Sequence, residues 1–111
     1  MFKSASIVEC ETAYPNTVCV SLEVRAIFKG DTTVAEIADF QQRCQDAVWQ
    51  TRAHGVSSSQ LPNLGVSMEY GALCLKGGTD WNATPEGAVK LTTELTRKLS
   101  ELGCDVVCSK V

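Results

Sequence analysis

The sequence predicts an α+β fold, a two-layer sandwich in which two helices cover one face of a mixed four-stranded sheet. Residues 17–29 alternate apolar and polar side chains, which is typical of a strand with one buried face. Residues 33–53 and 84–102 each repeat apolar side chains at helical spacing. The 111 residues suffice for one domain, and their predicted order is β-β-α-β-α-β. We therefore expect a ferredoxin-like arrangement or a variant of it.

The chain is expected to begin with a β-hairpin. Residues 14–17, Tyr-Pro-Asn-Thr, indicate a turn, because proline presets φ and asparagine tolerates the position that follows. Residues 4–12 form the strand before this turn and residues 17–29 the strand after it. The alternation of residues 4–12 is the poorer of the two, which favours an edge position for the first strand.

Two capped helices follow from local signals. Thr33 and Glu36 fit a capping box at the start of the first helix, and Gly55 is a natural end for it. Thr84 caps the second helix, with Pro85 in its first position, and Gly103 ends it. The apolar stripes expected to face the core are Ile37, Phe40, Cys44, Ala47, Val48 and Thr51 in the first helix, and Ala88, Leu91, Leu95, Leu99 and Leu102 in the second.

Residues 64–76 are expected to form a third strand, between a polar loop at 55–63 and a loop at 77–83. The apolar residues change phase at Gly71 and Ala72. A β-bulge at the glycine would explain the change. A central strand that is apolar on both faces is the alternative. Residues 104–108 form a short last strand.

Charge and hydropathy exclude two kinds of partner. The net charge is −3, and among the ten basic residues only Arg97 and Lys98 are adjacent. Nucleic-acid binding needs clustered cations, so we expect no nucleic-acid partner. No apolar run approaches the roughly 20 residues that cross a bilayer, so we expect no membrane partner. The carboxylate of Glu9 interrupts any apolar segment of a signal peptide, and we therefore expect a cytoplasmic protein.

The six cysteines are expected to be free, inert thiols. Cytoplasmic thiols stay reduced, and the sequence contains no C-x-x-C pair for a metal. Cys104 and Cys108 on one strand would lie roughly 13 Å apart, too far for one bridge or one zinc ion. We expect no disulfide, no bound metal and no cofactor. The cysteines are Cys10, Cys19, Cys44, Cys74, Cys104 and Cys108.

No arrangement of residues indicates catalysis. His54 is the only histidine, and Cys44 precedes it by ten residues on the same predicted helix, roughly 15 Å away. A set of acidic residues on strands could bind a divalent cation. We favour a solvated sheet face balanced by Arg25, because the spacing of the acids is not that of a metal site. These acids are Glu9, Glu11, Glu23 and Glu69.

The predicted loop at 76–84 is the candidate ligand site. It leads from a strand to a helix N-terminus, where backbone N–H groups favour anions. A plain turn in which Trp81 covers the core is the alternative. The candidate ligand-binding residues are Lys76, Gly77, Gly78, Thr79, Asp80 and Trp81.

Trp49 indicates an interface on the first helix. It lies about 140° around the helix from the core stripe, and tryptophan is enriched in interface hot spots. The loop at 55–63 could instead fold back over its indole. The side chains that share this face are Ala38, Gln42, Gln45 and Arg52.

These observations predict a non-enzymatic protein-interaction module that forms a homodimer. The alternative is a small-ligand or anion-binding protein, or a minor enzyme, that uses the loop at 76–84.

Overall fold

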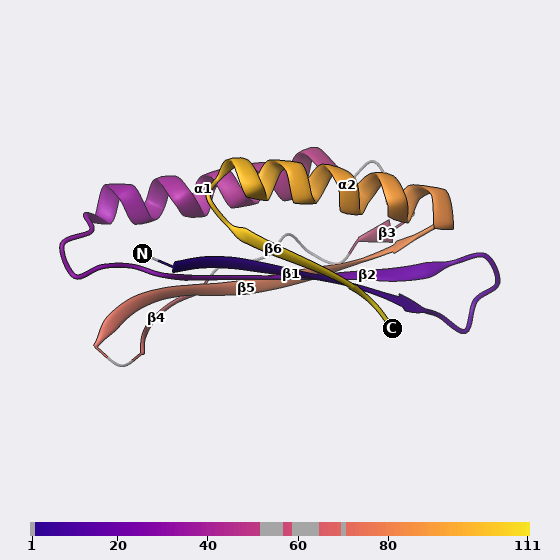
Figure 1. Cartoon of the computed structure of the whole chain (residues 1–111), viewed down its shortest axis with the longest axis horizontal. Helices are drawn as coiled ribbons and strands as arrows, with labels where there is room; N and C mark the ends of the chain where they lie inside the picture. The colour runs from indigo at the N-terminus through magenta and orange to yellow at the C-terminus, as the bar shows by residue number, and fades with distance from the viewer. Residues whose placement is uncertain (1, 52–56, 59–64, 70) are drawn as a thin grey trace.

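The computed structural model describes residues 2–51, 57–58, 65–69 and 71–111. Helices α1 (Val34–Thr51) and α2 (Pro85–Glu101) form one layer, and a β-sheet forms the other. Figure 1 shows both helices on the same side of the sheet. The predicted α+β sandwich with two helices on one sheet face is therefore confirmed.

The described residues form a sheet of six strands, two more than predicted. Its order is β3-β5-β2-β1-β6, and β4 pairs with β5 beside β3. A ferredoxin-like sandwich has the chain order β-α-β-β-α-β, whereas this chain starts with the β1–β2 hairpin. The fold is accordingly a variant. The strands are β1 (Phe2–Glu11), β2 (Val18–Ile27), β3 (Ser57–Ser58), β4 (Gly65–Glu69), β5 (Ala72–Ala83) and β6 (Asp105–Lys110).

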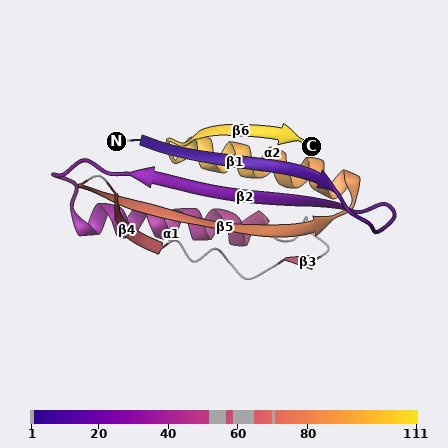
Figure 2. The same cartoon turned by 90° about the horizontal axis from the view of Figure 1, so that it is seen from below.

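The predicted edge position of the first strand is wrong. β1 lies inside the sheet, antiparallel to β2 and parallel to β6. α2 carries the chain across the sheet, so β6 lies beside β1 rather than beside β5 (Figure 2). The alternation of β1 is poor because Lys3 and Glu9 lie on the helix-facing side, next to buried Ala5 and Ile7.

The predicted strand at 64–76 is a hairpin instead. β4 ends at Glu69 and β5 begins at Ala72. These two residues are antiparallel partners, so the chain turns back on itself between them. Gly71 has φ +78°, a conformation that suits glycine in a turn. The change of phase at Gly71 and Ala72 marks a reversal of the chain, and neither a bulge nor a two-sided central strand is present there.

The predicted loop at 77–83 is also wrong. β5 continues to Ala83 and pairs with β2 over ten residues, from Ile27 opposite Cys74 to Val18 opposite Ala83. Gly77 and Gly78 do not end the strand, because the pairing with β2 continues through both of them, with Val24 and Glu23 opposite. Ser57 and Ser58, within the predicted loop at 55–63, form the short strand β3.

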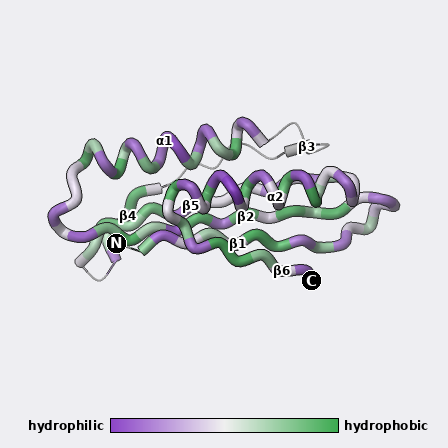
Figure 3. The backbone as a smooth tube through the Cα atoms, turned by 45° about the horizontal axis from the view of Figure 1, so that its top comes forward, coloured by the Kyte–Doolittle hydropathy of each residue, from purple (hydrophilic) through white to green (hydrophobic). Residues whose placement is uncertain are grey.

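Both helices pack as their stripes predict. All six stripe residues of α1 are buried, as are Ala88, Leu91, Leu95 and Leu99 of α2, while Leu102 is partly buried. Figure 3 shows the corresponding alternation of polar and apolar residues along both helices. The hydroxyl of Thr33 accepts a hydrogen bond from the Glu36 N–H (3.2 Å), and that of Thr84 accepts one from the Gly87 N–H (3.1 Å). These bonds satisfy N–H groups that a helix start leaves unpaired.

The core and the cap should differ in their contribution to stability. Leu95 is fully buried, so Leu95→Ala should lower the free energy of unfolding by about 2–5 kcal/mol. Thr33→Ala removes one capping bond at an exposed helix end and should cost about 1 kcal/mol. Urea denaturation of both variants measures the difference. A larger loss for Thr33→Ala would contradict the packing described here.

Candidate functional site

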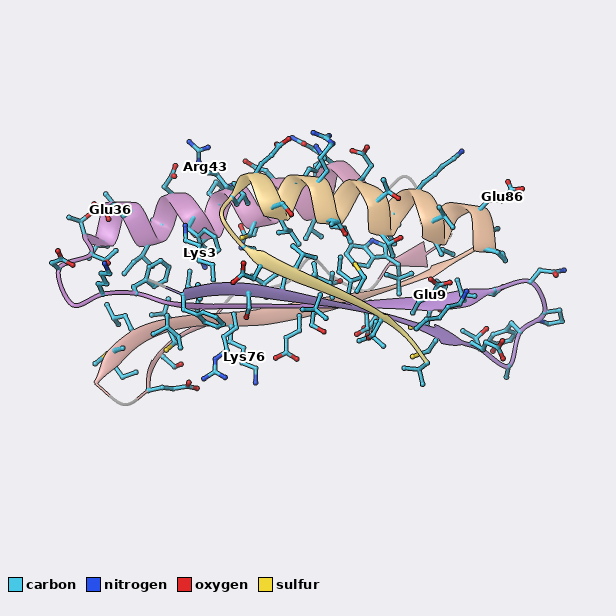
Figure 4. All side chains as sticks on the ribbon, in the orientation of Figure 1. Lys3, Glu9, Glu36, Arg43, Lys76 and Glu86 are labelled. Carbon is cyan, nitrogen blue, oxygen red and sulfur yellow. The ribbon has the colours of Figure 1, made fainter. Side chains whose placement is uncertain are left out.

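The predicted ligand residues lie in the middle of a strand and do not converge. Successive side chains of β5 point to opposite faces. Thr79 and Trp81 are buried on the helix side, whereas Lys76 and Asp80 are exposed on the other side. Figure 4 shows Lys76 pointing away from the helices. Lys76 precedes Thr84, the α2 cap, by eight strand residues, or about 26 Å, so it cannot serve an anion at that helix N-terminus.

A shallow hollow does exist on the helix-free face, above Gly77 and Gly78. Its volume is about 370 Å³, and Ser21, Glu23, Lys76 and Asp80 are among its lining residues. Lys76 Nζ lies 3.7 Å from Glu23 Oε1. The hollow thus carries charges of both signs, with a cation already beside an anion, and its geometry selects no particular ligand charge.

The four acidic strand residues are divided between the two faces. Glu23 and Glu69 lie on the helix-free face, where Glu69 forms an ion pair with Arg25. Glu9 lies on the helix-facing side, with its carboxylate 3.9 Å from Lys110 Nζ. Among the described residues, no three histidine, cysteine or acidic side chains are placed to hold a metal ion. His54 lies outside the described residues.

A second hollow lies between α2 and the strands β1 and β6. It measures about 450 Å³ and includes Thr96, Cys108 and Glu9 in its lining. The Thr96 hydroxyl lies 3.3 Å from the Cys108 sulfur. Thr92, also in the lining, donates its hydroxyl to the Ala88 carbonyl of its own helix (2.9 Å). The hydroxyls of Thr92 and Thr96 are thus engaged with the helix backbone and with Cys108 rather than directed at a common point.

Burial makes two of the thiols poor nucleophiles. Desolvation, with a smaller effect of nearby Cys104, raises the pKa of Cys44 to about 12. Desolvation also raises the pKa of Cys104. Because the thiolate is the reactive form, these two cysteines act as small apolar residues of the core.

The predicted interface face of α1 is accessible. Trp49 is 49% exposed, and Ala38 and Gln42 are exposed as well, while Gln45 is half-buried. Gln42 donates its amide to Asp46 on the same helix (2.9 Å). Arg52 lies outside the described residues. The role of this face as an interface stays a prediction.

Sequence reasoning missed an exposed apolar cluster on the β4–β5 hairpin. Val66 is 57% and Met68 63% exposed, and Leu73 lies directly opposite Met68. These three residues, the β4 cluster, share one face of the hairpin, because Val66 and Met68 are two residues apart on β4 and Leu73 is the partner of Met68; Figure 2 shows where the hairpin lies in the sheet. The phase change at Gly71 was the available signal: interpreted as a turn, it would have placed Val66 and Met68 on an additional strand.

The outer backbone edge of β4 is unpaired within the part of the chain that the structure describes. The N–H of Phe28, the residue that follows β2, donates to the Leu73 carbonyl (2.9 Å), so the backbone groups of Leu73 face the β2 side. Its partner Met68 is therefore in a non-hydrogen-bonded pair, and its N–H and C=O point outward. Val66, two residues away, points the same way. The edge thus offers two donors and two acceptors.

β6 forms the opposite edge of the sheet, and its composition is different. It is parallel to β1 and carries Asp105 at one end and Lys110 at the other, both exposed. Charged side chains discourage strand addition at an edge. Only Val107 is a strongly exposed apolar side chain within β6, at 64%.

Comparisons with known proteins returned no match: no family model, no curated protein and no solved structure resembles this chain. No helix among the described residues has the length and apolar character needed to span a membrane.

Gly78 should be required by the close approach of β5 to β2. A Cβ atom at this position would lie 2.5 Å from the Leu22 carbonyl oxygen, a backbone atom that cannot move alone. Gly78→Ala should therefore destabilise the protein by about 1–3 kcal/mol. Gly30→Ala is the control, because nothing lies within 4 Å of the added carbon. Equal unfolding midpoints for the two variants in urea would disprove the tight approach.

Proposed function

We propose that the protein is a non-enzymatic interaction module that forms a homodimer through the outer edge of β4. The observation that carries this proposal is the coincidence of two features on β4. Its exposed apolar side chains, Val66 and Met68, belong to the same residues whose outward backbone groups have no partner among the described residues. A strand added there would satisfy the backbone groups and cover the apolar side chains at once.

The edge is complementary to itself. Two copies related by a two-fold axis at Ser67 would align their β4 strands antiparallel, with Val66 of one copy opposite Met68 of the other. Both residues point their N–H and C=O outward, so each opposed pair would form two hydrogen bonds. The same axis repeats this pair, giving four bonds and a continuous sheet through both copies. Closed two-fold pairing of this kind is the commonest form of self-association.

Charge supports the same alignment. In this register Gly65 of one copy faces Glu69 of the other, and Lys76 is the neighbour of Gly65 on β5. Because Gly65 has no side chain, Lys76 would face Glu69 of the second copy across two strand spacings, about 9.6 Å. Both side chains are long enough to meet over that gap. The two-fold axis gives this contact twice.

A second copy explains this surface better than an extended peptide of another protein does. One register of two copies would pair Val66 with Met68 on one face of the joined sheet and Lys76 with Glu69 on the other. Both contacts use only residues of this chain. β4 has only five residues, so the contact area falls at the low end for specific interfaces. We expect a dimer at micromolar rather than nanomolar concentrations.

The Trp49 face is the second candidate surface for the same function. It lies on the helix layer, so a dimer formed there would stack helices rather than extend the sheet. The favouring observation is the half-exposed indole alone. We place the β4 edge first because it combines apolar exposure, unpaired backbone groups and charge in one register. The alternative ligand-binding function on residues 76–84 stays a prediction; residues 76–83 lie in β5 rather than in a loop, and Lys76 is far from the α2 N-terminus.

A charge placed on β4 should break the dimer. Met68→Lys removes an exposed apolar side chain and places two ammonium groups near each other across the two-fold axis. Val107→Lys is the matched control, because Val107 has the same exposure on the opposite edge. Sedimentation velocity at high micromolar concentration should give a dimer for the wild type and for Val107→Lys, and a monomer for Met68→Lys.

Three outcomes of that experiment would count against the β4 edge. A strictly monomeric wild type removes the homodimer altogether. A dimer lost in Val107→Lys but kept in Met68→Lys moves the interface to β6. A dimer lost only in Trp49→Ala, with the Met68→Lys variant unaffected, moves it to the face of α1. Circular dichroism of each variant establishes that the loss is not due to unfolding.

A further inference from the structure

Two cysteines lie directly opposite each other on neighbouring strands. Cys10 on β1 is the register partner of Cys19 on β2, close to the turn that joins the two strands. Both side chains lie on the helix-free face of the sheet and are half-buried. The other cysteines are placed differently: Cys44, Cys74 and Cys104 are buried, and Cys108 lies on β6 beside Thr96.

The hydrogen-bond pattern sets the distance between the two strands at this pair. The Val111 N–H donates to the Glu9 carbonyl (2.9 Å), so the backbone groups of Glu9 face β6. Its neighbour Cys10 therefore faces β2, and Cys10 and Cys19 form a hydrogen-bonded pair. The Cα atoms of such a pair lie about 5.5 Å apart, within the 4.4–6.8 Å that a disulfide spans.

We propose that Cys10 and Cys19 are a reversible thiol–disulfide site that a small disulfide such as oxidised glutathione converts. One thiolate attacks a sulfur of the oxidant, and one glutathione thiolate leaves. The second protein thiol loses its proton and attacks the protein sulfur of the mixed disulfide, which releases the second glutathione. Overall, the two cysteines lose two protons and two electrons, and one oxidised glutathione becomes two reduced glutathiones. The proposal is independent of the dimer.

The surroundings of the pair slow its oxidation. Desolvation raises the pKa of Cys19, and the Asp80 carboxylate and Cys10 raise it further. A raised pKa leaves little thiolate at neutral pH, so oxidation is slow without an added disulfide. The proposal departs from the sequence-based expectation of inert thiols, because it assigns a redox reaction to Cys10 and Cys19.

Strand geometry makes the disulfide reducible. Cβ atoms of opposite residues lie about 4.5–5.5 Å apart, whereas a relaxed disulfide needs about 3.8 Å. The two strands must approach each other slightly to close the bond, and strained, exposed disulfides are the labile ones. Closure would also tie the ends of the turn at residues 12–17, in which the Thr12 hydroxyl donates to the Thr17 carbonyl (3.1 Å).

Mass spectrometry of the oxidised protein tests the pair. The experiment uses the folded Cys108→Ser variant, so that the exposed thiol on β6 does not form adducts. After incubation with oxidised glutathione, we expect a mass lower by two hydrogen atoms, without glutathione attached. Peptide mapping should join Cys10 to Cys19, and dithiothreitol should restore the starting mass. The oxidised form should unfold a few degrees higher, because a short loop is closed.

The control is Cys19→Ser in the same background, in which Cys10 should carry a glutathione adduct and no internal bond should form. A stable adduct on Cys10 while Cys19 is still present would overturn the proposal, because the second thiol would then be out of reach. A disulfide that joins either cysteine to a different partner would also overturn it. So would the absence of any reaction under conditions in which the unfolded protein reacts.

Discussion

The antiparallel pairing of β2 with β5 is the contact on which the rest of the structure depends. It extends over ten residue pairs and joins the N-terminal hairpin to the second half of the chain. Its register places Val20 beside Trp81, and Ala26 beside Leu75, on the helix-facing side. A slip of one residue would turn all of these side chains to the solvent. The helices can pack only because this ladder presents one continuous apolar face.

The same ladder explains why Gly77 and Gly78 are compatible with a strand. Glycine lowers strand stability when nothing compensates for its freedom. Here the β5 backbone approaches β2 so closely that a Cβ atom at Gly78 would meet the Leu22 carbonyl. The pairing requires glycine at this point, and the shallow hollow on the helix-free face is its consequence. Gly77 and Gly78, which were predicted to belong to a ligand-binding loop, are therefore residues of a paired strand.

The two edges of the sheet are unequal, and this difference directs the functional proposal. β6 has charged residues at both ends, whereas β4 exposes Val66 and Met68 on an edge that no other described strand pairs with. Unpaired apolar edges favour strand addition, and natural proteins usually protect them. The helix-free face, with the Arg25–Glu69 and Lys76–Glu23 pairs, is mixed in charge and typical of a solvated surface. Association through an edge leaves that face, and the thiol pair on it, open to solvent.

The sequence by itself determined the fold class, both helices and their buried stripes. Helix caps and apolar spacing depend on residues only three or four positions apart, so they can be recognised without knowing the tertiary structure. The tertiary structure alone decided the strand partners. The local sequence of residues 64–83 is compatible with a loop as well as with strands. Only the pairing with β2 makes Lys76 and Asp80 part of a strand. The interior place of β1 and the opposition of Cys10 and Cys19 also depend on pairing. The apolar period of a strand reports which face is buried, but it carries no information about which strand lies beside it.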